Sequence, residues 1–183
     1  MSEPLSIERR DEMWGQLRQM LLSGVHPEHG DPFKDVVPVV VYQAHAAHNA
    51  AFLARLKAAN HKCGGDTIVA LGYHGDGHGG MVPGEAFILE REMSDDGWSS
   101  DGFVDGYAVN GTSFVFTDDT ATWVVLTVGD VQVIACGRAL LDAFFDDLPA
   151  AVAASEEFRN LFDRAAILPA FQAMASRGRL PYL

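Results

Sequence analysis

The chain has 183 residues, of which 48% are hydrophobic and 21% are charged, and its formal net charge at pH 7 is −12. This composition excludes a disordered chain, and a domain of this length can bury enough apolar surface to fold without a metal or a disulfide. The negative charge disfavours sequence-independent binding to DNA or RNA. We therefore expect one folded domain over residues 1–183.

No apolar run approaches the ~20 residues that a membrane helix needs, and the N-terminal stretch "MSEPLSIERRDEM" is charged where a signal peptide would be apolar. The two cysteines, Cys63 and Cys136, follow no C-x-x-C spacing, and unpaired thiols are usual in the cytosol. The sequence predicts a cytoplasmic protein that does not bind membranes or nucleic acids.

The first predicted element is a helix over residues 6–22, with Ser6 as its N-cap. Its apolar residues recur at helical spacing, which is typical of a helix that buries one face. They are Met13, Leu17, Met20 and Leu21. Residues 23–35 follow with two prolines, two glycines and no periodicity, so they are predicted to form a loop.

A strand over residues 36–44, a helix over residues 45–62 and a strand over residues 67–74 are predicted next. The order strand, helix, strand is that of a βαβ unit, here spanning about residues 36–74. In such a unit the two strands are parallel neighbours in one sheet.

Four segments rich in β-branched and aromatic residues follow: "EAFILERE", "SFVFTDD", "TATWVVLTVGD" and "VQVIACG". Gly129 and Asp130 lie between the last two, which is the signal of a two-residue hairpin of type II′. A polar connection separates the first two at residues 93–111, and a helical segment is expected at about residues 138–178. The sequence thus predicts an α+β fold with a mixed, mostly antiparallel sheet.

The stretch "TIVALGYHGDGHGGMVPGE", residues 67–85, is the first candidate site. Its glycines do not match a dinucleotide-binding loop, because a strand and not a helix follows them. Asp76 and Gly77 form a strong turn dipeptide with a strand on each side. The stretch is therefore either a plain hairpin turn or a turn that carries a reaction centre.

The reaction-centre hypothesis depends on two histidine pairs meeting near Asp76. His45 and His48 are three residues apart on a predicted helix, and His74 and His78 flank the turn. If the strands of the βαβ unit are neighbours, both pairs lie at the same end of the sheet. Imidazoles with a carboxylate suit a transition metal such as zinc, which would support hydrolysis. Asp66, Glu85 and Glu90 are candidate bases, although the spacing selects none of them and does not match H-E-x-x-H.

The connection at residues 93–111 is the second candidate site. It places aromatic side chains among carboxylates, a composition typical of an anchor for a basic protein partner. The alternative is that the aromatic rings cap the core while the aspartates make turns. The residues concerned are Asp95, Asp96, Trp98, Asp101, Phe103 and Asp105.

Cys63 stands beside His61 and Lys62 in "NHKCGGD", an electropositive setting that predicts a lowered thiol pKa. No orienting third group can be named for it, so nucleophilic catalysis has less support.

Two hypotheses follow. The first is a non-enzymatic interaction or inhibitor module that binds a basic protein, similar to bacterial immunity proteins in size and charge though not in motif. The second is a small metal-dependent enzyme of the hydrolase type. The partner, the substrate and the oligomeric state are left open by the sequence.

Overall fold

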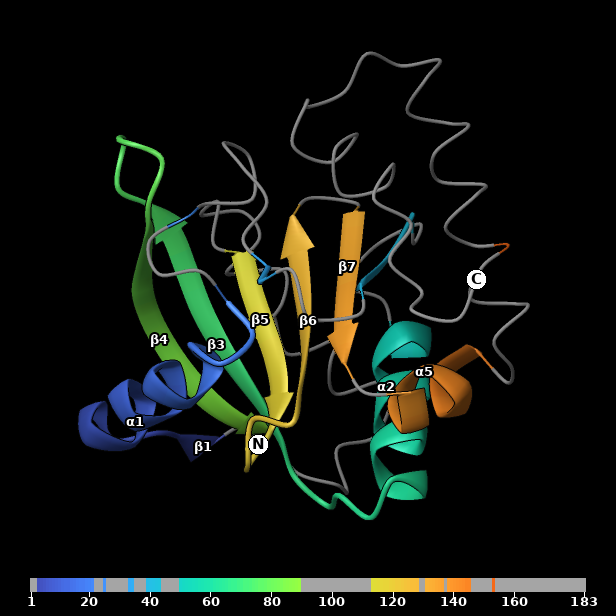
Figure 1. The fold of residues 1–183 in the computed structure, drawn as a ribbon. Helices are drawn as coiled ribbons and strands as arrows, with labels where there is room; N and C mark the ends of the chain where they lie inside the picture. The colour runs from blue at the N-terminus through green and yellow to red at the C-terminus, as the bar shows by residue number, and fades with distance from the viewer. Residues whose placement is uncertain are drawn as a thin grey trace.

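The computed structural model describes residues 3–21, 25, 33–34, 39–43, 50–89, 113–128, 131–136, 138–145 and 153. Within these residues, strands and helices form an α+β fold, as expected (Figure 1). The helices are α1 (Ile7–Leu17), α2 (Ala50–Lys62) and α5 (Arg138–Phe145). The strands are β1 (Glu3–Pro4), β2 (Val39–Gln43), β3 (Ile68–Gly75), β4 (Met81–Leu89), β5 (Ser113–Asp118), β6 (Trp123–Val128) and β7 (Val131–Cys136).

The seven strands form one sheet in the order β1-β4-β3-β5-β6-β7-β2, and each described pairing is antiparallel. The succession β2, α2, β3 matches the predicted βαβ order, but the expected contact between β2 and β3 is wrong. β3 pairs with β4 on one side and β5 on the other, which leaves it no edge for β2. Strands β5, β6 and β7 therefore separate β2 from β3. Because the four pairings between them are all antiparallel, β2 and β3 still run in the same direction.

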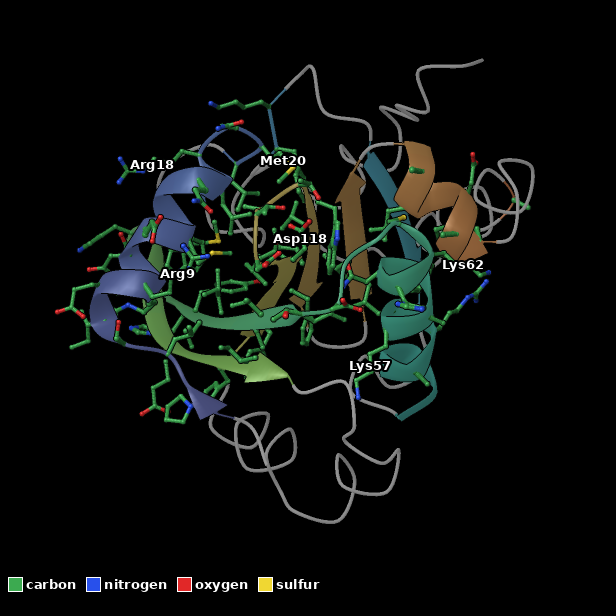
Figure 2. All side chains as sticks on the ribbon, turned by 90° about the horizontal axis from the view of Figure 1, so that it is seen from below. Arg9, Arg18, Met20, Lys57, Lys62 and Asp118 are labelled. Atoms are coloured by element: carbon green, nitrogen blue, oxygen red, sulfur yellow. The ribbon has the colours of Figure 1, made fainter. Side chains whose placement is uncertain are left out.

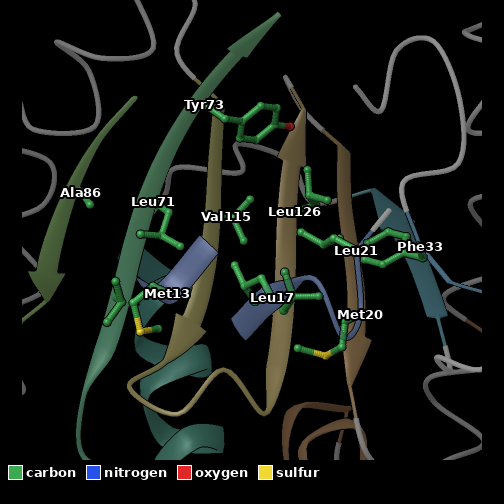
Figure 3. Packing of buried hydrophobic residues seen from close by; sticks show 12 residues of the cluster. Met13, Leu17, Met20, Leu21, Phe33, Leu71, Tyr73, Ala86, Val115 and Leu126 are labelled. Atoms are coloured by element: carbon green, nitrogen blue, oxygen red, sulfur yellow. The ribbon is translucent and has the colours of Figure 1, made fainter. Parts of the chain in front are cut away.

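Helix α1 covers one face of the sheet. The Ser6 side chain accepts a hydrogen bond from the Arg9 backbone N–H at 3.2 Å, which confirms the predicted N-cap. The helix ends at Leu17, earlier than residue 22, and the chain continues in turns to Leu21, which bridges to Phe33. Figure 3 shows this face of the core. Its buried residues include Met13, Leu17, Met20, Leu21, Val69, Leu71, Tyr73, Val115, Val124 and Leu126.

Helices α2 and α5 pack against each other and lie on the side of β7 in Figure 1, whereas α1 lies beside β3 and β4. The Arg55 guanidinium joins them, since it donates to the Phe144 carbonyl oxygen and stands 4.8 Å from the centroid of the Phe144 ring. Side chains alternate along a strand, so Trp123 faces away from the α1 side that buries Val124. Trp123 instead contacts Asn60 of α2.

The β6–β7 hairpin has the predicted two-residue connection, because Val128 pairs with Val131. Gly129 and Asp130 themselves lie outside the described residues, as do the connection at 93–111 and most of the expected helical segment at 138–178. In the part of the chain that the structure describes, no helix is long and apolar enough to cross a membrane.

Candidate functional site

The histidine-containing stretch forms the β3–β4 hairpin, and the Asp76 side chain stabilises the turn between the two strands. One carboxylate oxygen, Oδ1, accepts hydrogen bonds from the His78 N–H at 2.7 Å and the Gly80 N–H at 2.9 Å. Gly77 and Gly79 have φ angles of 79° and 96°, where a side chain would be strained. The two backbone N–H groups, that of Gly80 foremost, lower the pKa of the Asp76 carboxyl. The aspartate therefore has a structural task in the turn.

His74 and His78 are both exposed, and His74 lies opposite Val82 in the β3–β4 ladder. Among the described residues, no three His, Cys, Asp or Glu side chains are close enough together to hold a metal ion. Of the candidate bases, Asp66 is paired with His61 at 3.4 Å, Glu85 is exposed on β4, and Glu90 lies outside the described residues.

His45 and His48 lie outside the described residues, so a metal site that includes them stays a prediction. The expected convergence of the two histidine pairs assumed that β2 and β3 are neighbours in the sheet, and they are not. Four strand spacings of ~4.8 Å put roughly 19 Å between the two strands along the sheet.

Cys63 does not have the lowered thiol pKa that its basic neighbours predict. Partial burial of the sulfur, and then the negative charge of Asp118, raise the pKa of this thiol above its ordinary value, although the residue as a whole is exposed. The sequence argument was wrong because it considered only the basic residues adjacent in the chain, and neither the burial nor the charge at the end of β5 can be seen there. A thiol with a raised pKa is a poor nucleophile near neutral pH.

Sequence reasoning missed the corner where α2 turns into β3. The Asn60 side chain is buried, donates to the Thr67 carbonyl oxygen at 3.1 Å and accepts from the Trp123 indole N–H at 3.2 Å. Gly64 and Gly65 close the helix by donating to the carbonyl oxygens of His61 and Asn60, which is a Schellman motif. The "Gly-Gly" after the helix was the available signal.

The β5–β6 turn lies beside this corner and connects it to α1. Asp118 is buried and accepts hydrogen bonds from Thr120 Oγ1 at 3.0 Å, from the Thr122 N–H at 2.7 Å and from the Thr122 hydroxyl. Arg9 of α1 donates to the Asp119 carbonyl oxygen at 2.8 Å. Figure 2 labels Asp118 and Arg9 in the view from below. The polar groups of this turn are thus engaged with the fold itself.

The second candidate site, in the connection at 93–111, lies entirely outside the described residues. The structure therefore does not place Asp95, Asp96, Trp98, Asp101, Phe103 or Asp105. The sequence itself shows where the acidic residues lie. Residues 85–183 hold 16 of the 25 acidic residues and six of the 13 basic ones, whereas residues 1–84 hold nine and seven. Most of the net charge of −12 therefore belongs to the second half of the chain.

Comparisons with known proteins give no relative to reason from: no protein-family model matches the chain, and no curated protein or solved structure is significantly similar to it.

Proposed function

We propose that this chain is an acidic, non-enzymatic interaction protein that binds a basic protein partner, in the manner of an inhibitor. The observation that carries the proposal is the distribution of charge. Residues 1–84 are nearly neutral, with nine acidic and seven basic residues, whereas residues 85–183 carry 16 acidic and six basic ones, including the four aspartates at positions 95, 96, 101 and 105. The cytoplasmic location expected from the sequence is part of the same proposal.

The physical argument concerns both affinity and rate. Acidic side chains gathered in a few segments steer a basic protein toward those segments, and an aromatic side chain among them supplies apolar burial once contact is made. Trp98 and Phe103 are the aromatic residues that stand among the acidic ones. Association governed by such charges weakens as salt screens them.

The test is affinity capture from cells that produce the protein, followed by calorimetric titration of each captured protein against purified chain. We expect a basic partner whose affinity falls as salt rises. Changing Asp95, Asp96, Asp101 and Asp105 to asparagine should abolish binding. The matched control neutralises Glu8, Asp66, Glu85 and Asp119, four exposed acidic residues outside the connection at 93–111, and should preserve binding. Equal losses in both variants would reduce the effect to net charge and contradict the proposed site.

The metal-dependent alternative is tested separately by elemental analysis of protein purified without a histidine tag. A near-stoichiometric transition metal that is lost in both His45→Ala and His74→Ala variants would favour the enzyme over the interaction module. Metal at background level in the parent, also after incubation with zinc, would remove the alternative.

A further inference from the structure

The two edges of the sheet differ in how they are closed. Strand β1 covers the end of β4, and Leu5 extends that cover by donating its N–H to the Ala86 carbonyl oxygen at 2.9 Å. Beyond it, the Arg10 guanidinium donates to the Gly84 carbonyl oxygen at 3.3 Å, and Pro83 has no N–H to offer. Prolines, bulges and charged side chains of this kind prevent further strands from adding to an edge.

Among the strands that the structure describes, β2 forms the opposite edge, and its own residues include none of these devices. It pairs with β7 along its whole length, from Val39 to Gln43, and no other described strand pairs with its outer side. Its sequence, "VVVYQ", contains no proline and no charge, and its three valines have high β propensity. A strand of this kind presents a row of backbone N–H and C=O groups on which another strand can pair.

We propose that β2 is a dimerisation edge, at which the β2 strands of two copies pair antiparallel about a two-fold axis and continue the sheet from one copy into the other. The inference does not depend on the basic partner proposed above, because it concerns a different part of the chain and a different kind of contact.

Charge favours a second copy as the occupant. Two chains of net charge −12 repel each other, so they approach best where neither carries a charge, and residues 36–44 have none. A basic partner, by contrast, would meet no carboxylate on this strand. Antiparallel pairing of identical strands also gives a closed, isologous contact and extends the antiparallel pattern of the sheet.

The first test is sedimentation velocity across protein concentration, at about 0.05 M and about 1 M sodium chloride. We expect a monomer–dimer equilibrium that tightens with salt, because salt screens the repulsion between like-charged copies over distances beyond ~3 Å at 1 M. The basic-partner contact has the opposite salt dependence. A monomer at every concentration in both salts would overturn the proposal.

A pair of proline variants tests the edge itself. Consecutive residues of a strand point their N–H groups to opposite sides, so only one of Val40→Pro and Val41→Pro removes a hydrogen bond to β7. The other removes a donor from the outer edge and should leave a folded monomer whose melting temperature is close to that of the parent. If this folded variant dimerised as tightly as the parent, β2 would not be the dimer contact.

Hydrogen exchange gives a readout that needs no variant. The amides of residues 39–43 that point away from β7 should exchange more slowly as protein concentration rises, whereas those that bind β7 and those of residues 81–89 in β4 should not change. Protection of the outward amides that is the same at every concentration would mean that this edge is paired within one chain, and this too would overturn the proposal.

Discussion

The indole N–H of Trp123 donates to the side-chain oxygen of Asn60 across 3.2 Å, and this bond joins the sheet to the end of α2. Both residues are buried, at 2% exposure each. The Trp123 carbonyl oxygen also accepts from the Thr117 hydroxyl at 2.6 Å, so its backbone is bound to β5 while its indole N–H binds the helix. One asparagine thus couples the α2–β3 corner to the middle of the sheet.

The first prediction concerns Asn60→Ala. The substitution leaves the Trp123 N–H and the Thr67 carbonyl oxygen without their side-chain partner, and a buried unsatisfied polar group costs about 1–3 kcal/mol. We expect the free energy of unfolding in urea to fall by that amount and the tryptophan fluorescence to change. Lys62→Ala, an exposed change on the same helix, should stay within about 0.5 kcal/mol of the parent. An Asn60→Ala protein as stable as this control would contradict the assigned role.

The second prediction compares two glycines. A Cβ atom at Gly65 would lie only 2.3 Å from the Asn60 side-chain oxygen, whereas one at Gly15, in α1, would meet nothing within 4 Å. Gly65→Ala must therefore displace Asn60 and should destabilise the protein. Gly15→Ala should stabilise it by about 0.5–1 kcal/mol, because alanine is the better helix former. Opposite signs in thermal or urea unfolding are expected, and equal signs would contradict the crowding at Gly65.

Much of the fold could be predicted from the sequence, because hairpins and helix caps are encoded locally. Ser6 and the two-residue β6–β7 connection are examples. The position of β2 could not be predicted, since it depends on which strands pair with the two edges of β3. One edge pairs with β4, the next strand, but the other pairs with β5, which comes only after the connection at residues 93–111. The prediction of a lowered Cys63 pKa failed for a related reason, because the pKa is set first by burial in the folded chain and then by Asp118, which is remote in sequence. Non-local contacts decided both outcomes.

The third prediction is the pH dependence of the β3–β4 hairpin. The pKa of Asp76 is lowered from 3.8 by its bonds to the Gly80 and His78 N–H groups. A lowered pKa means that the stabilisation is present above pH 3.8 and is lost as the pH falls through the pKa of the folded protein. In NMR spectra the amide protons of His78 and Gly80 should shift together, with a midpoint below pH 3.8. Midpoints at or above that value, or two different midpoints, would show that the carboxylate does not bind both amides.

The fourth prediction concerns the α2–α5 contact. Arg55 binds the Phe144 carbonyl oxygen and lies over the Phe144 ring, and its guanidinium is planar, whereas a lysine ammonium is not. Arg55→Lys should therefore loosen α5 even though the charge is kept. Hydrogen exchange in residues 138–145 should become several-fold faster, with residues 81–89 unchanged as the internal control. Unchanged exchange in α5 would mean that Arg55 does not hold the two helices together.

The fifth prediction orders the reactivity of Cys63. Only the thiolate reacts with iodoacetamide, and burial raises the thiol pKa more than the charge of Asp118 does. At pH 7.5 the folded parent should therefore be alkylated at Cys63 more slowly than the urea-unfolded chain, as followed by peptide mass spectrometry. Asp118→Asn should react at an intermediate rate, because it removes the smaller cause and leaves the larger one.

Asp66→Asn is the matched control for this ordering, because Asp66 is an exposed carboxylate near Cys63 in the sequence but makes its ion pair with His61. It should react at the parent rate. If Asp66→Asn accelerated alkylation as much as Asp118→Asn, the thiol would be responding to net charge alone. If the folded parent reacted faster than the unfolded chain, the basic neighbours His61 and Lys62 would control the thiol after all, and Cys63 would return as a candidate nucleophile.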